Sequence, residues 1–298
     1  MPELPEVQTI VNDLNKKVKG STITNVMTDW PKSFWRSPGG FNGFRKEVKG
    51  RKIIKIWRIG KNIIFDLSGN EEMLIHQKMT GHLLFGEWEG RNGKWMSKQK
   101  GVMVEKVNSY IRAMFFLRGH SSKVGASKMM AFSDMRKFGK ILAVKKEDFK
   151  NLEDVKNIGP DPLTIKFNEF KSLISKKRGP IKKILMDQNI VSGIGNIYAD
   201  EILFVAGIHP LVKTEKLNNE KLKRIFNAGK KILKKAVKLR GTSTYDYRDT
   251  AGKPGHYGEA RLVYQRTGAR CPNRCGGIIE KVKIGQRSAH FCPACQKL

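Results

Sequence analysis

The first six residues, MPELPE, bring together groups that are suited to covalent catalysis. Proline at position 2 permits removal of Met1, and the new terminus is then a secondary amine. An α-amino group has a pKa near 8, against about 10.4 for lysine, so about a quarter of the terminus is neutral at pH 7.4 but only about 0.1% of a typical lysine. A neutral amine at Pro2 can attack a sugar C1′ or a carbonyl carbon to give a Schiff base, and Glu3 is close enough in the chain to transfer a proton. Taken alone, the same residues fit an ordinary solvated terminus better than a catalytic one.

The four cysteines all lie after residue 270, in the pattern Cys271-x3-Cys275 and Cys292-x2-Cys295. Two close pairs separated by a segment of hairpin length are typical of a tetrahedral thiolate site, so the sequence predicts one structural Zn²⁺ ion. Four protein ligands leave no open position for catalysis. The segment between the pairs offers two strands and a tip at residues 285–287, and we expect the metal to hold Arg287 rigidly toward a phosphate.

A third motif, QNIVSGIGNIYADEILFVAGIHP, covers residues 188–210. Gly193, Gly195 and Asn196 separate two helical segments in it. Such a turn leaves backbone N–H groups free at a helix start, where they can bind a phosphate. The glycine spacing alone is a weak signal and favours an ordinary corner between two helices.

The elements that must position these groups change in type along the chain. Residues 5–18 have apolar side chains on one helical face, and Pro5 and Glu6 suit the first turn of that helix. From about 21 to 145, short β-rich runs separated by glycine indicate a sandwich or barrel, with a turn at Gly60-Lys61. The Lys- and Gly-rich stretch 88–109 is expected to be a loop.

Residues 157–164, NIGPDPLT, contain two prolines and a glycine and predict a linker. Helical patterns follow at 180–186 and 219–238, and 241–258 is expected to be a loop. We therefore predict an α+β multidomain protein in four parts: a catalytic helix plus β-sandwich over 1–150, a linker over 151–164, a helical domain with a lid loop over 165–258, and a zinc finger over 259–298.

Charge is the strongest global signal, because 58 Lys and Arg face 27 Asp and Glu, a net charge of +31. This imbalance favours a polyanion partner, nucleic acid before a membrane surface. No apolar run approaches the roughly 20 residues that would span a bilayer. The first 25 residues contain no signal-peptide pattern. We therefore expect a cytoplasmic protein that associates with the genome and not with a membrane.

Four segments in order, MPELPEV, DMRKFG, GIGNIYADEILFVAGIHP and GQRSAHFCPACQ, make the chain resemble the bacterial formamidopyrimidine-DNA glycosylases over essentially its whole length. The resemblance implies an N-terminal β-sandwich behind a leading helix, a helical domain with a helix–two-turns–helix motif, and a C-terminal four-cysteine zinc finger. It also implies damaged double-stranded DNA as the partner.

The resemblance further implies a bifunctional glycosylase and AP lyase that excises oxidised purines, such as 8-oxoguanine and formamidopyrimidines. Pro2 would attack C1′, expel the base and form an imine, and β- and δ-eliminations would then cut the strand. Glu3 would be the general acid. Lys61 would contact phosphate and donate a proton in β-elimination, and Arg287 would serve phosphate binding and δ-elimination. Glu6 is expected to be structural.

A base inside the duplex must be flipped out before it can react. Met79, Arg136 and Phe138 match the residues that fill the gap in this family, two by stacking and one by hydrogen bonding to the orphaned base. Without the family context, Met79 and Phe138 would fit core packing. The resemblance implies the following phosphate contacts: His76, Lys137, Lys182, Asn196 and, more weakly, Lys177.

The chain departs from the family pattern at several positions. The first cysteine pair has three intervening residues where two are usual. Gln77 replaces an expected leucine, and Asn108 or Ser109 replaces an expected histidine. Tyr245 occupies a position in the lid that is usually basic. The stretch 88–109 is longer and more basic than expected.

Two other functions remain open from the sequence. One is the endonuclease VIII type of glycosylase, which prefers oxidised pyrimidines; the PELPE start, with Leu4, and the long lid favour the purine branch. The other is a DNA-binding protein without catalysis, which would need the basic surface and the cysteines but not a free Pro2 beside Glu3. We expect no small-molecule cofactor and a monomer.

Overall fold

The computed structural model describes residues 1–119, 128–243 and 246–298. The chain forms two compact units. The first contains residues 1–2, 6–156 and 240–256, and the second contains residues 3–5, 157–239 and 257–298. The segment 240–256, which the sequence analysis assigned to the helical domain, packs within the first unit. The four-part functional division therefore stays a prediction, and the two units are described separately below.

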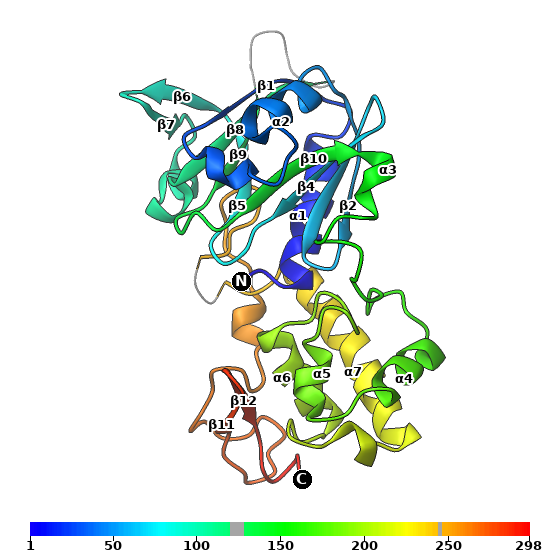
Figure 1. Cartoon of the computed structure of the whole chain (residues 1–298). Coiled ribbons are helices and arrows are strands. Elements are labelled where there is room, and N and C mark those ends of the chain that lie inside the picture. Colours follow the sequence, from blue (N-terminus) through cyan, green and yellow to red (C-terminus); the bar gives the residue numbers. More distant parts are fainter. Residues whose placement is uncertain (120–127, 244–245) are drawn as a thin grey trace. The chain divides into compact units, whose positions relative to one another are not determined.

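The first unit contains two four-stranded antiparallel sheets (Figure 1). In the first sheet the strand order is β1 (Thr22–Thr28), β8 (Ile111–Arg118), β9 (Met129–Ser133) and β5 (His82–Gly86). In the second it is β10 (Lys140–Lys145), β4 (Glu71–His76), β3 (Asn62–Leu67) and β2 (Ile53–Ile59). Short helices α2 (Gly40–Val48) and α3 (Lys146–Phe149) and 3₁₀ turns at 31–34, 101–104 and 106–108 complete the unit.

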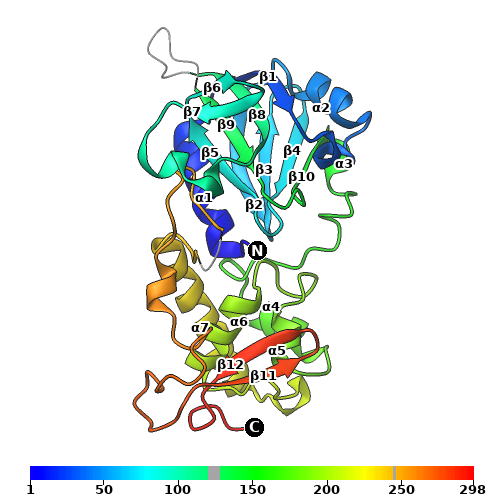
Figure 2. The ribbon, with the colours of Figure 1, turned by 90° about the vertical axis from the view of Figure 1, so that its left-hand side faces the viewer.

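The two sheets form a β-sandwich (Figure 2). Successive side chains of a strand point to opposite faces. In β3, Ile63 and Phe65 therefore enter the core that the sheets share, while Ile64 belongs to a second cluster with Phe149 outside the sandwich. The predicted sandwich is confirmed.

Helix α1 (Leu4–Lys17) begins one residue before the predicted start. Its apolar face, which includes Val7, Ile10 and Leu14, is buried in the same core as the sheets. Burial of three such side chains contributes roughly 5–9 kcal/mol before the entropy cost of ordering them. The sandwich thus fixes the helix that follows the N-terminal residues.

The expectation of a loop over 88–109 was wrong in part. Strands β6 (Trp88–Arg91) and β7 (Lys94–Ser97) form a hairpin there (Figure 1). Asn92 and Gly93 form its turn, and both have positive φ, 49° and 73°. This pair favours the tight turns whose twist matches a hairpin. The Asn-Gly dipeptide was the sequence signal for it.

The second unit is mainly helical, with α4 (Phe167–Ser175), α5 (Ile181–Leu185), α6 (Asn196–Ala206) and α7 (Asn219–Lys238). The predicted helices at 180–186 and 219–238 are present within one residue. Asn218 caps α7 by accepting a hydrogen bond from the N–H of Lys221 at 2.9 Å. A buried cluster that includes Ile202, Leu203 and Ile232 joins α6 to α7.

The C-terminal part of this unit is a two-stranded hairpin of β11 (Glu280–Ile284) and β12 (Arg287–Phe291), preceded by a 3₁₀ turn at 257–260 (Figure 2). Its tip lies at residues 285–286, within the predicted 285–287, and Arg287 is the first residue of β12; Gly285 has a positive φ of 58°. Among the described residues, no helix is long and apolar enough to cross a membrane.

Candidate functional site

The carboxylate of Glu3 is held at the N-terminus of α6. It accepts hydrogen bonds from the N–H groups of Gly195 at 2.8 Å, Ile197 at 2.9 Å and Tyr198 at 3.3 Å. A Cβ at Gly195 would lie 2.4 Å from Cδ of Glu3, so the close approach requires glycine. From the sequence these N–H groups could bind a phosphate, with an ordinary corner as the favoured alternative; in the structure they bind the chain's own carboxylate, whose negative charge suits the positive helix end.

Glu6 connects α1 to the segment 240–256 within the first unit. Its Oε1 accepts a hydrogen bond from the N–H of Thr242 at 2.7 Å. Gly241 has a positive φ of 80°, and a Cβ there would lie 2.7 Å from the same oxygen. Arg240 adds a second connection by pairing with Asp13 at 2.5 Å and Asp249 at 2.6 Å. These contacts agree with the structural role expected for Glu6.

Lys61 lies at the β2–β3 turn, and His76 lies at the end of the neighbouring β4. Nδ1 of His76 accepts a hydrogen bond from the N–H of Lys78 at 2.9 Å. Burial first, and then nearby cations that include Lys78, Lys140 and Lys61, lower the pKa of His76 to about 3. The imidazole is therefore neutral near pH 7 and carries its proton on Nε2, where it can donate a hydrogen bond without adding charge.

Met79, Arg136 and Phe138 come together on the surface of the first unit. The guanidinium of Arg136 lies 4.8 Å from the ring centroid of Phe138 and 3.1 Å from Sδ of Met79. Both apolar side chains are about half exposed, 43% for Met79 and 51% for Phe138. Met79 and Phe138 are therefore surface residues, and the alternative that they pack in the core is wrong.

The turn that carries Arg136 is fixed by a buried carboxylate. Asp134 accepts hydrogen bonds from the N–H groups of Gly139 at 2.7 Å and Arg136 at 3.2 Å and from the hydroxyl of Thr80. Lys137 has a positive φ of 59°, and its ammonium lies 4.1 Å from the ring centroid of Trp30. A strained turn held by this many contacts presents its side chains in a defined geometry.

Two departures from the family pattern have structural explanations. Gln77 is buried and donates to the carbonyl of Gly81 at 3.1 Å across a tight turn. Asn108 is also buried; its Oδ1 lies 2.9 Å from Nε2 of His82, and its amide donates to the carbonyl of Gly252 at 3.2 Å. Burial lowers the pKa of His82 to about 4. Tyr245 lies outside the described residues.

The second unit contains the other predicted DNA contacts. Asn196 is the first residue of α6, and its Oδ1 is buried without a hydrogen-bond partner among the described residues. Lys177 is exposed between α4 and α5. Lys182, in contrast, is buried. Its ammonium lies 2.7 Å from Oδ1 of Asp200 and donates a hydrogen bond to the carbonyl of Ser288 at 2.5 Å.

Sequence reasoning missed two buried carboxylates, Asp200 and Glu201 of α6. Oδ2 of Asp200 accepts the backbone N–H of His290 at 2.9 Å and lies 3.0 Å from its Nδ1. Glu201 accepts three backbone N–H groups of residues 262–264, each at 2.9 Å, and the hydroxyl of Tyr257 at 3.1 Å. Two acids within the apolar helix sequence YADEILF were the available signal, because buried charges need partners.

Arg287 is exposed at the first position of β12, the same strand that Lys182 and Asp200 contact at Ser288 and His290. It lines a cavity of about 260 Å³ together with Lys182, Lys183, Met186, Asp187 and Ile284. The cationic side chains of this cavity suit a phosphate group.

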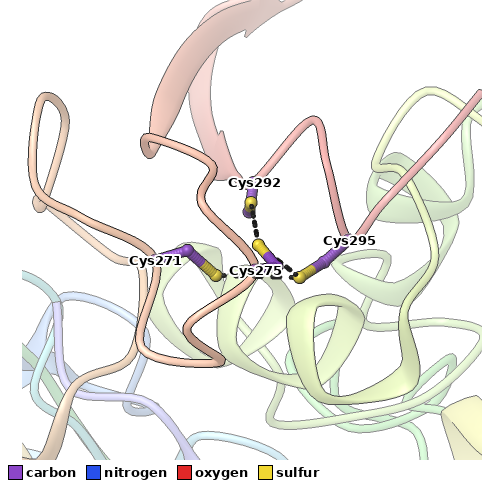
Figure 3. Close-up of side chains that lie close together, drawn as sticks. All are labelled: Cys271, Cys275, Cys292 and Cys295. Carbon is purple, nitrogen blue, oxygen red and sulfur yellow. Dashed lines mark hydrogen bonds between the residues drawn. The ribbon is translucent and has the colours of Figure 1, made fainter.

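The four cysteines meet beside the β11–β12 hairpin (Figure 3). Sγ atoms lie 3.7 Å apart for Cys271 and Cys295, 3.6 Å for Cys275 and Cys292, and 3.2 Å for Cys275 and Cys295. Tetrahedral thiolates with bonds of about 2.3 Å to zinc would be roughly 3.8 Å apart. A Cβ at Gly277 would lie 2.7 Å from Sγ of Cys292, so glycine is required next to the cluster. The extra residue in the first pair leaves a four-thiolate metal site intact.

Comparisons with known proteins match every part of this architecture. Three family models match: the formamidopyrimidine-DNA glycosylase N-terminal domain over residues 1–141, the H2TH domain of the same enzymes over 158–248, and the zinc finger found in FPG and IleRS over 270–298. The formamidopyrimidine-DNA glycosylase of Heliobacterium modesticaldum is 34% identical over 299 residues. The match covers 100% of this chain and 100% of the relative. That of Chloroflexus aurantiacus is 35% identical, with 99% of this chain and 98% of the relative covered.

Solved structures agree with the sequence relatives. The Lactococcus lactis Fpg in complex with DNA that contains an abasic site has a TM-score of 0.83 and 29% identity, and the match covers 99% of this chain and 100% of that chain. The same protein in complex with DNA that contains Fapy-dG has a TM-score of 0.82.

The β-sandwich, the helix–two-turns–helix region and the four-cysteine finger together define a DNA glycosylase of the zinc-finger class. At more than 30% identity over its full length, the chain belongs to the formamidopyrimidine-DNA glycosylase family.

Proposed function

We propose that this protein excises oxidised purines from double-stranded DNA through a Schiff base at Pro2 and then cleaves the strand by β- and δ-elimination. The observation that carries the proposal is the attachment of Glu3 to three N–H groups of α6, because it fixes an acidic group directly next to the nucleophile. Solved relatives in complex with abasic-site and Fapy-dG DNA support the substrate class.

In the proposed reaction the nitrogen of Pro2 bonds to C1′, and the C1′–base bond breaks, with its electrons leaving on the base. The carboxylate of Glu3 takes up the N–H proton that the Pro2 nitrogen loses and passes it to O4′ of the sugar. The C1′–O4′ bond breaks with its electrons on O4′, which leaves an iminium between Pro2 and C1′. Loss of a proton from C2′ then expels the 3′ phosphate, with Lys61 as proton donor. A second elimination expels the 5′ phosphate, and Arg287 binds that phosphate.

We propose that Met79, Arg136 and Phe138 fill the gap left by the flipped nucleotide. Their mutual contacts and exposure support this role. We further propose that phosphates are bound by His76 as a neutral donor and by Lys137, Lys177 and Asn196. Since Lys182 is buried, we propose that it acts on phosphate through the strand that carries Arg287.

The cysteine cluster is proposed to bind one Zn²⁺ ion through Cys271, Cys275, Cys292 and Cys295. With four thiolates the ion has a structural role, which is to hold the hairpin and Arg287. Damaged double-stranded DNA is the proposed partner. A monomeric state, the absence of a small-molecule cofactor and a cytoplasmic location stay predictions.

Borohydride trapping tests the mechanism. The protein with Met1 removed should form a covalent complex with a duplex that contains 8-oxoguanine, and Pro2→Ala or an uncleaved N-terminal tag should greatly weaken trapping. Pro5→Ala is the matched control, because Pro5 lies in the first turn of α1 and has no free amine. Equal trapping by Pro2→Ala would refute the proline mechanism. A parallel duplex with an oxidised pyrimidine distinguishes the endonuclease VIII type.

A further inference from the structure

A cavity of about 600 Å³ in the second unit is not used by the proposed reaction. It lies where the end of α6, the chain after it, the first turns of α7 and the last residues of the chain meet. Pockets of this volume are typical of specific ligand sites in proteins. The chemistry of the residues that line the cavity determines which ligand it can bind.

Five of its twelve described lining residues are cationic, whereas 58 of all 298 residues are. None of the twelve is Asp or Glu. Within residues 1–119, 128–243 and 246–298, no carboxylate forms an ion pair with any of the five. The lining also contains Cys295 of the cysteine cluster and Leu298, whose α-carboxylate is the last group of the sequence, so the cations are in excess but not unopposed. The excess of like charges repels, and a bound anion relieves that repulsion. These cations are Lys213, Lys216, Lys221, Arg224 and Lys297.

The floor of the same cavity is aliphatic. Ile208 and Val212 are buried at 2% and 8% exposure, and Leu211 is half-buried beside them. A phosphate chain has no apolar group that could use this floor. An aliphatic or aromatic side chain would use it, because its burial contributes about 1.5–3 kcal/mol.

We propose that this cavity docks an acidic peptide segment of a partner protein, with carboxylates on the cationic rim and one apolar side chain on the aliphatic floor. Charge complementarity selects the segment and the anchor residue fixes its position. The cavity shares Cys295 with the proposed metal site but no residue with the proposed catalytic or phosphate-binding groups, so the proposal does not depend on the reaction assigned above.

Fluorescence anisotropy on the full-length, zinc-loaded protein tests the proposal with a labelled peptide of four aspartates and a C-terminal phenylalanine. The probe should bind more tightly than the same peptide ending in serine. The double variant Lys221→Glu with Arg224→Glu should weaken binding about tenfold or more. The matched control, Lys231→Glu with Lys234→Glu, makes the same charge change at exposed positions of α7 outside the cavity and should have a much smaller effect.

Leu211→Ser should remove the preference for phenylalanine over serine while the aspartates still bind. Equal weakening by both charge-reversal pairs would overturn the proposal, because attraction would then depend on net charge alone. Equal affinity for the two peptides would also overturn it. Tripolyphosphate or an undamaged duplex that displaces the probe more effectively than unlabelled peptide would assign the cavity to phosphates instead. Excision of 8-oxoguanine should be unchanged in the cavity variants.

Discussion

The buried ion pair between Lys182 and Asp200 makes the sharpest stability prediction. The two side chains are 1% and 0% exposed, and their charged atoms are 2.7 Å apart. Asp200→Ala would leave the ammonium without its counter-charge and the N–H of His290 without its acceptor. Removing one partner of a buried pair costs about 3–5 kcal/mol, so the free energy of unfolding of the second unit should fall by about that amount.

The double variant Asp200→Ala with Lys182→Met should be much less destabilised than the sum of the two single variants. Burial lowers the pKa of Lys182 even though Asp200 opposes the shift, so removing both charges also removes a desolvation cost. Urea unfolding followed by far-UV circular dichroism measures these changes, because the second unit contains most of the helix. Lys183→Met, an exposed neighbour, is the control and should change stability by no more than about 0.5 kcal/mol.

Two results would refute this reasoning. A cost below about 1 kcal/mol for Asp200→Ala would show that the ammonium finds another partner or reaches solvent. Additive costs in the double variant would show that the two charges do not depend on each other.

Four further predictions concern the site. Gly195→Ala should slow excision of 8-oxoguanine while DNA binding persists, because a Cβ would displace Glu3; Gly258→Ala, where a Cβ meets nothing within 4 Å, is the control. As pH drops from about 6.5 toward 4, the stability of the first unit should fall, because His82 and His76 are neutral in the fold, with pKa values of about 4 and about 3, and gain their protons first in the unfolded chain. The share of His82 is up to about 3 kcal/mol; in pH-dependent urea unfolding, His82→Gln should remove that share and leave the slope that His76 contributes. DNA affinity should fall about a hundredfold between about 50 and 200 mM salt if four cations bind phosphates, and a flat dependence in anisotropy titrations would contradict this. Cys275→Ser or a strong chelator should reduce DNA binding more than it changes the near-UV dichroism of the first unit, which contains all five tryptophans; full activity after stoichiometric zinc release would exclude a structural role for the metal.

The elements that were predictable from sequence are those with strong local signals. Apolar periodicity predicted the ends of α7 and α1 to within one residue, and the spacing of the two cysteine pairs predicted the thiolate cluster. The hairpin at 88–97 carried a local signal in Asn92-Gly93, which composition obscured because the stretch is rich in lysine and glycine. Charge-rich segments are easily mistaken for loops when their turn chemistry is not considered.

The contacts that could not be predicted join residues far apart in the chain. Glu3 and Gly195 are separated by 192 positions, and Asp200 and His290 by 90. Local patterns contain no information about such pairs unless a family supplies it. For this reason the sequence suggested a phosphate at the start of α6, whereas the fold brings a carboxylate there. The burial of Lys182 could not be predicted for the same reason, since it depends on contacts with Asp200 and with Ser288 of β12, which is distant in the chain.

The attachment of β12 to α6 also explains how the first knuckle of the finger can contain an additional residue. The strand is held at His290 by Asp200 and at Ser288 by Lys182, through contacts that involve neither Cys271 nor Cys275. Length variation in that knuckle can therefore be absorbed locally without shifting the arginine at the strand's first position. An insertion between Arg287 and His290 would instead change the spacing between that arginine and the contact of His290 with Asp200.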